Sequence, residues 1–140
     1  MKSFRNITLF VAFALVMVLM PATAKNRMIP KAYMFGFVAS FNDSVVFFTD
    51  IQQVDSVWVN DKKGFLAGRS SYAYQLRDFF NKSFNMPNRT CIVVSDPDRK
   101  KVEKKYAKLK KIYVTKGAGK YDVHYTNASE FRFQTVNMGE

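Results

Sequence analysis

A dense run of basic residues between positions 99 and 111 is the part of the sequence best suited to bind something. The segment holds eight lysines and arginines and one acid, Glu103. Such a concentration of one charge favours an anionic partner, since like charges repel unless an anion is near. The residues assigned to this binding are Arg99, Lys100, Lys101, Lys104, Lys105, Lys108 and Lys111. The alternative is a solvated helix face that keeps the protein in solution, with cations in the last turn favoured by the helix dipole.

Nucleophilic chemistry has few candidates here. Cys91 and His124 are the only cysteine and the only histidine, and together they could form a nucleophile–base pair. However, Cys91 precedes the apolar run Ile92-Val93-Val94, which predicts a buried and inert thiol. One cysteine and one histidine cannot complete a usual zinc site, and the carboxylates are sparse. We therefore predict no catalytic residue, no metal and no cofactor, and keep a cryptic hydrolase using Cys91, His124 and an aspartate as the alternative.

A glycine-rich segment at 116–120 does not fit the phosphate-binding loop. That loop needs a glycine where Val114 stands and a serine or threonine where Tyr121 stands. The segment Lys116-Gly-Ala-Gly-Lys120 is therefore interpreted as a turn.

Two further pairs of residues are candidate surface contacts. Tyr74 and Arg77 lie on the polar face of a predicted helix, where they could contact a partner or a sugar. Ser44 and Ser56 each stand in an Asp-Ser-Val triplet, which resembles a short signal for O-glycosylation and is also an ordinary turn former.

The surrounding pattern predicts an α+β fold built on a small mixed sheet. Alternating apolar residues over 33–41 and 45–51, with a turn between them, predict a central antiparallel hairpin. Residues 54–59 are either a third short strand or an extended connection. The expected order is β-β-α-β-α-β, with a possible last strand at 131–136 and with both helices on one face of the sheet.

Two helices are predicted from periodicity and capping. The first begins with Ser70 or Ser71 as its N-cap and ends near Phe84. The second, which carries the lysines, begins with Asp96 as N-cap and Pro97 in the first helical position. Strands are expected over 90–95 between the helices and over 121–126 after the second.

The N-terminus has the pattern of a cleavable signal peptide. Lys2 and Arg5 precede an apolar run from Ile7 to Met20 that is shorter than the roughly 20 residues of a membrane span. We predict cleavage between Ala24 and Lys25. The expected organisation is a signal peptide over 1–24, a flexible basic lead-in over 25–32 and a single domain over 33–140, with no transmembrane span after cleavage.

Charge and predicted compartment together narrow the partners. Without Lys2 and Arg5 the formal charge of +11 becomes +9. Export to the periplasm or outside the cell argues against nucleic acid, and it favours an acidic protein, an anionic glycan or lipid headgroups. A single cysteine excludes an intramolecular disulfide framework.

Several segments carry a resemblance to a known group of proteins. They are Lys31–Ser44, Phe48–Gln52, Tyr74–Phe80, Pro87–Cys91 and Glu130–Phe133. In these the chain resembles small uncharacterised exported proteins of Bacteroides-like bacteria, over most of residues 25–140. The resemblance implies a Gram-negative envelope or secreted location and supplies no activity and no site residue. We therefore predict a non-enzymatic binding module, with the cryptic hydrolase and an envelope assembly subunit as alternatives.

Overall fold

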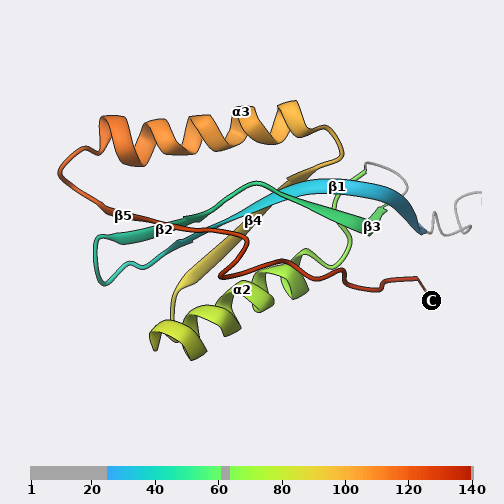
Figure 1. Cartoon of the computed structure of the whole chain (residues 1–140), viewed down its shortest axis with the longest axis horizontal. Coiled ribbons are helices and arrows are strands. Elements are labelled where there is room, and N and C mark those ends of the chain that lie inside the picture. The colour runs from blue at the N-terminus through green and yellow to red at the C-terminus, as the bar shows by residue number, and fades with distance from the viewer. Residues whose placement is uncertain (1–24, 61–63, 140) are drawn as a thin grey trace, which may run out of the picture.

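A computed structural model describes residues 25–60 and 64–139, and it confirms the predicted α+β class and mixed sheet (Figure 1). The predicted signal peptide and Ala24 lie outside the described residues. The strands are β1 (Asn26–Ala39), β2 (Val45–Thr49), β3 (Gln52–Asn60), β4 (Thr90–Asp96) and β5 (Asp122–Thr126). The helices are α2 (Arg69–Phe84) and α3 (Arg99–Lys110), and Lys111–Lys116 continue α3 in wider π-helical turns.

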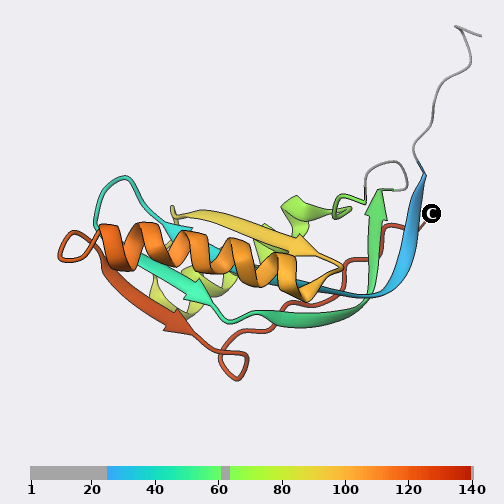
Figure 2. The same cartoon turned by 90° about the horizontal axis from the view of Figure 1, so that it is seen from above.

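β1 is the central strand of the sheet. It pairs antiparallel with β4 on one side and with β2 and then β3 on the other, while β5 adds to β2 in parallel (Figure 2). The predicted hairpin is confirmed, with Phe37 opposite Phe48 and Val38 opposite Phe47. β3 settles the open question at 54–59 in favour of a strand.

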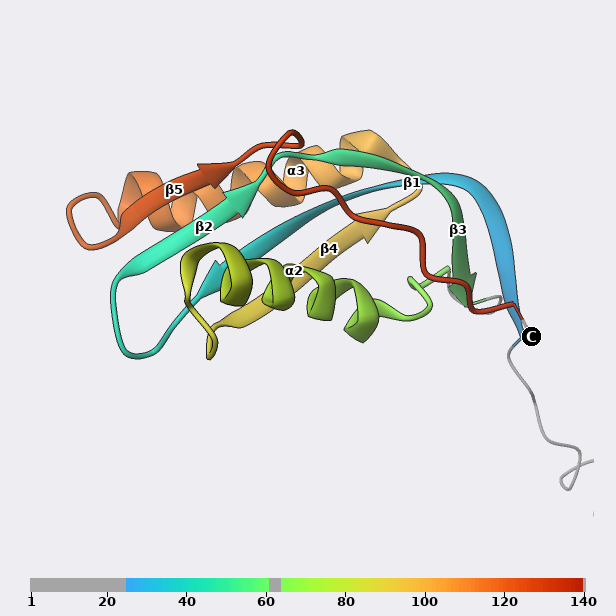
Figure 3. The same cartoon turned by 60° about the horizontal axis from the view of Figure 1, so that its bottom comes forward.

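The two helices cover opposite faces of the sheet, so the prediction that they share one face is wrong (Figures 1 and 3). In β1, Met34 and Val38 pack in the same core as Leu76 of α2. Phe37 packs on the other face with Tyr106 of α3. Side chains alternate between the faces of a strand, and here both faces are apolar, so each needs its own cover.

The structure also differs from the sequence prediction in two segments, one at each end of the domain. Residues 26–32 are not a flexible lead-in, because they form the first half of β1 and pair with β3. Residues 131–136 form no strand, although Phe131 and Phe133 are buried in the core beneath α2. Gln52 holds this segment instead, since its side chain donates to the Phe131 carbonyl at 2.8 Å and accepts from the Phe133 N–H at 2.9 Å.

Both helices begin at caps other than the predicted ones. Gly68, in the left-handed region with φ of 73°, precedes α2 in the place expected for Ser70 or Ser71. The N-cap of α3 is Asp98, whose carboxylate accepts the Lys100 N–H at 3.0 Å. Asp96 instead accepts the N–H of Asp98 at 2.8 Å and so supports the turn before the helix.

One buried guanidinium ties the start of β4 to the turn between β1 and β2. Arg89 donates to the Val45 carbonyl at 2.9 Å and to the Asp43 carboxylate at 2.6 Å, and it lies over the Phe47 ring. Its side chain is only 6% exposed, so these contacts replace the water that it loses.

The packing of α2 gives a direct stability prediction. Leu76 is fully buried against β1, so Leu76→Ala is expected to lower the free energy of unfolding by about 2–5 kcal/mol, through lost burial and a residual cavity. Urea unfolding followed by circular dichroism measures it. Ile112→Ala is the control, because its exposed side chain predicts a change of about 0.5 kcal/mol or less. An unchanged midpoint in Leu76→Ala would contradict the placement of α2.

The lowered pKa of Asp43 predicts that the folded protein loses stability in acid. The hydrogen bond from the Val45 N–H is the main cause of its lowered pKa and Arg89 adds to it, while partial burial acts in the opposite direction. A carboxyl whose pKa is lower in the folded chain stabilises it above the ordinary value near 3.8, and this stabilisation is lost as pH falls through the folded pKa.

Urea midpoints at pH 6, 4 and 2.5 test this linkage in the wild type and in Asp43→Asn. The variant should be less stable at pH 6 and should lose less stability on acidification. Equal losses in both proteins would show that Asp43 does not carry the effect.

Candidate functional site

The cationic surface of α3 is held in place by a narrow buried stripe. Val102 is fully buried, and Tyr106 meets Phe35 edge-on with ring centroids 5.0 Å apart. In the following turns Tyr113 packs on Phe37 at 4.7 Å. Because these side chains fix the rotation of the helix, the remaining positions are forced outward.

Those outward positions form a surface that we call the lysine face. It consists of exposed side chains with no carboxylate partner in the described part of the chain. Its members are Lys100, Lys101, Lys104, Lys105, Lys108 and Lys111.

Two basic residues of α3 differ from the lysine face. Arg99 bonds to Glu103 at 2.9 Å and lies over the Tyr33 ring, so part of its charge is already balanced. Lys110 turns inward, with its ammonium group 5.5 Å from the ring centroid of Tyr106 and 5.1 Å from that of Tyr125. The uncompensated positive charge of α3 therefore belongs to the lysine face.

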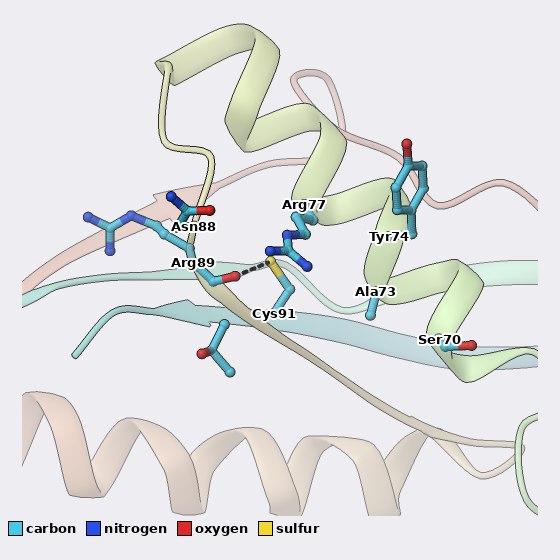
Figure 4. Close-up of a pocket in the computed structure, with 8 residues that line it drawn as sticks. Ser70, Ala73, Tyr74, Arg77, Asn88, Arg89 and Cys91 are labelled. Atoms are coloured by element: carbon cyan, nitrogen blue, oxygen red, sulfur yellow. Dashed lines mark hydrogen bonds between the residues drawn. The ribbon is translucent and has the colours of Figure 1, made fainter. Parts of the chain in front are cut away.

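A polar cavity of about 430 Å³ lies between α2 and the first residues of β4 (Figure 4). The helix contributes Ser70, Ala73, Tyr74 and Arg77, whose spacing places them on one face. The other wall is residues 88–91. The predicted surface contacts Tyr74 and Arg77 thus line one cavity, and Figure 4 shows Arg77 extending toward Cys91.

A second cavity, of about 260 Å³, is mainly apolar, has four aromatic residues in its wall and lies on the α3 side of the sheet. Residues that line it include Phe37, Phe41, Ile92, Tyr113 and Tyr121. Phe41 stands at the turn between β1 and β2 with its side chain 99% exposed. This cavity could not be predicted from the sequence, because its walls come together only when β1, β4 and the turns after α3 are assembled.

The sheet separates Cys91 and His124 and excludes the proposed pair. Cys91 is opposite Val38, Val38 is opposite Phe47, and Phe47 is opposite His124. Three strand spacings therefore lie between them, which is roughly 14 Å. His124 contacts Asp122 at 3.0 Å and stacks on Phe47.

Cys91 is half-buried at the wall of the polar cavity, which corrects the prediction that it is buried. Burial raises the pKa of its thiol to about 11, despite the opposing charges of Arg77 and Arg89. The thiol also lies 3.9 Å from the Arg89 carbonyl. A protonated thiol at neutral pH is a poor nucleophile.

The remaining sequence candidates lie apart from these surfaces or form no site. Ser44 and Ser56 are exposed, the first in the turn before β2 and the second within β3. Over residues 25–60 and 64–139, no group of three His, Cys, Asp or Glu side chains could hold a metal ion. In the same residues no helix is long and apolar enough to cross a bilayer.

No protein-family model, curated protein or solved structure matches this chain. The resemblance to exported Bacteroides-like proteins therefore stays a prediction from the sequence.

The reactivity of the Cys91 thiol tests its half-buried position at the wall of the polar cavity. At pH 8, iodoacetamide should modify Cys91 in the folded protein roughly 10- to 100-fold more slowly than in protein unfolded in guanidinium chloride, because the raised pKa leaves little thiolate. The modified fraction is followed by mass spectrometry over time. Equal rates in the two states would contradict the half-buried, protonated thiol.

Proposed function

We propose that the protein is an exported, non-enzymatic binding module that attaches to an anionic surface through the lysine face of α3. The observation that carries the proposal is the set of exposed ammonium groups on one rigid helix with no carboxylate partner among the described residues. A helix that only has to be soluble can mix its charges, and mixed pairs at this spacing stabilise it. Keeping one sign on this face costs repulsion, which a bound anionic surface relieves.

The chemistry of lysine sets the expected kind of binding. An ammonium group is a point charge without the planar fork of arginine, so it suits clustered phosphate, sulfate or carboxylate groups more than one precise ligand. Such attraction is screened over about 10 Å at 0.1 M salt. Binding should therefore be broad in specificity and sensitive to salt.

The predicted export supports the choice of partner class. The signal-peptide pattern and the resemblance to exported proteins both predict an envelope or secreted location, where anionic glycans, lipid headgroups and acidic proteins are possible partners. Nucleic acid is a less fitting partner for the same reason. A cryptic hydrolase is not proposed further, since three strand spacings separate Cys91 from His124 in the sheet.

The test is charge reversal on the lysine face with a matched control. Lys104→Glu, Lys105→Glu and Lys108→Glu are combined in residues 25–140, and binding is measured to phosphatidylglycerol vesicles, phosphatidylcholine vesicles and heparin. At low salt the wild type should bind phosphatidylglycerol, heparin or both, and phosphatidylcholine weakly. At about 1 kcal/mol per lysine near an anionic surface, the triple variant should lose at least about 100-fold in affinity.

The control reverses three exposed basic residues outside α3, namely Lys31, Arg69 and Arg132. It has the same net charge as the test variant, so any dependence on total charge is removed. The control should bind nearly as well as the wild type. Equal losses in the two triple variants, or no binding by the wild type to either anionic probe, would refute the proposal, and the two anionic probes distinguish lipid from glycan.

A further inference from the structure

The polar cavity beside α2 combines a charged side chain with several neutral hydrogen-bonding groups (Figure 4). Apart from Arg89 and Cys91, its polar side chains make no hydrogen bond or ion pair within the described part of the chain. They are Ser70, Tyr74, Arg77, Asn88 and Thr90. No aspartate or glutamate of the described residues lines the cavity. The cavity therefore leaves donors and acceptors open to a ligand, and it is complementary to a negative charge.

Arg77 supplies the charge that a ligand can use. The other guanidinium of the wall, that of Arg89, is buried and already bonded to Asp43. The acid next to Arg77 on α2 is Asp78, which pairs with Lys82 at 3.1 Å. Figure 4 shows Arg77 extending into the cavity toward β4. Its planar fork matches a carboxylate, which can accept two parallel hydrogen bonds from it.

The neutral part of the wall suits a sugar ring. The hydroxyl groups of Ser70 and Thr90 and the amide of Asn88 can each donate and accept, as sugar hydroxyls do. Ala73 and Cys91, both half-buried, add less polar surface to the same wall. The ring of Tyr74 is 66% exposed, so an apolar C–H face of a ligand can pack on it. A pocket with apolar surface and a few placed polar groups is typical of small-molecule sites.

We propose that this cavity binds a sugar that carries a carboxylate, such as a hexuronic acid residue of an acidic glycan. The carboxylate would bond to Arg77, and the ring would pack on Tyr74 and Ala73. The ring hydroxyls would bond to Asn88 and Thr90. The volume of about 430 Å³ lies within the range of roughly 300–1,000 Å³ found for small-molecule sites.

This site is separate from the lysine face. The cavity adjoins α2, whereas the lysines lie on α3, and the two helices cover opposite faces of the sheet (Figures 1 and 3). The lysine face attracts an anionic surface through charge alone. The cavity would instead recognise one sugar residue through a carboxylate, a ring and hydroxyl groups together, whereas a simple anion on Arg77 would leave the neutral groups unused.

The test is a ligand titration followed by nuclear magnetic resonance. Methyl β-D-glucuronide and methyl α-D-galacturonide are each added to ¹⁵N-labelled residues 25–140 at about 0.15 M salt, where distant charges are screened. Amide shifts are recorded at every step. The matching methyl glucoside and galactoside have the same rings without the carboxylate. Sodium acetate has the carboxylate without the ring.

We expect at least one uronide to bind with a Kd of about 5 mM or tighter and to shift amides of residues 70–77 and 88–91. Its uncharged glycoside and acetate should each bind at least tenfold more weakly. Arg77→Gln should weaken the uronide at least tenfold, and Tyr74→Ala at least threefold.

Two control variants separate this site from general charge. Arg132→Gln removes an exposed cation outside the cavity and should stay within twofold of the wild type. The lysine-face triple variant should stay within threefold, so failure of the proposed surface attachment and failure of this site are distinguishable. The dispersion of each amide spectrum shows that the variant is folded.

Four results would overturn the proposal. The first is no shift of the cavity amides by either uronide at 20 mM. The second is equal binding of the uronide and its uncharged glycoside, since the carboxylate would then not be recognised. The third is equally tight binding of acetate, which would mean a simple anion on Arg77. The fourth is a set of shifts confined to α3, which would place the ligand on the lysine face.

Discussion

The structure depends on a single constraint, which is that β1 is apolar on both faces over its second half. Met34 and Val38 require cover on one side of the sheet, and Phe35 and Phe37 require it on the other. No arrangement with both helices on one face can satisfy the two sets, because exposing either would leave large rings and aliphatic groups in water. The three-layer order of α2, sheet and α3 follows from this alternation (Figure 1).

The two helices bury different amounts of their surface against the sheet, and this difference leaves the lysine face of α3 exposed to solvent. α2 buries Tyr72, Leu76 and Phe80 and is joined by the C-terminal segment, whose Phe131 and Phe133 complete a broad core. α3 has a much narrower stripe, so most of its circumference faces solvent and can carry lysines without disturbing the packing. β4 is an outer strand of the sheet, and its first residues border one cavity on the α2 side and one on the α3 side.

The local elements could be predicted from the sequence because their signals lie within a few residues. Period-two alternation located β2 and the second half of β1, and the helical spacing of Tyr72, Leu76 and Phe80 located α2. The side on which a helix packs is not local: it depends on which strands become neighbours. The same is true of the cavities, whose walls come from elements far apart in the chain, and of Cys91, which has apolar neighbours in the sequence but lies half-buried at the wall of the polar cavity.

Amide hydrogen exchange tests the central role of β1 most directly. If β1 is the two-sided core, the amides of residues 34–38 should be among the slowest to exchange in the folded protein. In β4 the Ile92 amide should exchange slowly because it bonds to β1, and the Cys91 amide, which faces away from β1 beside the polar cavity, should exchange faster. Uniform protection along β4, or fast exchange throughout 34–38, would contradict the account.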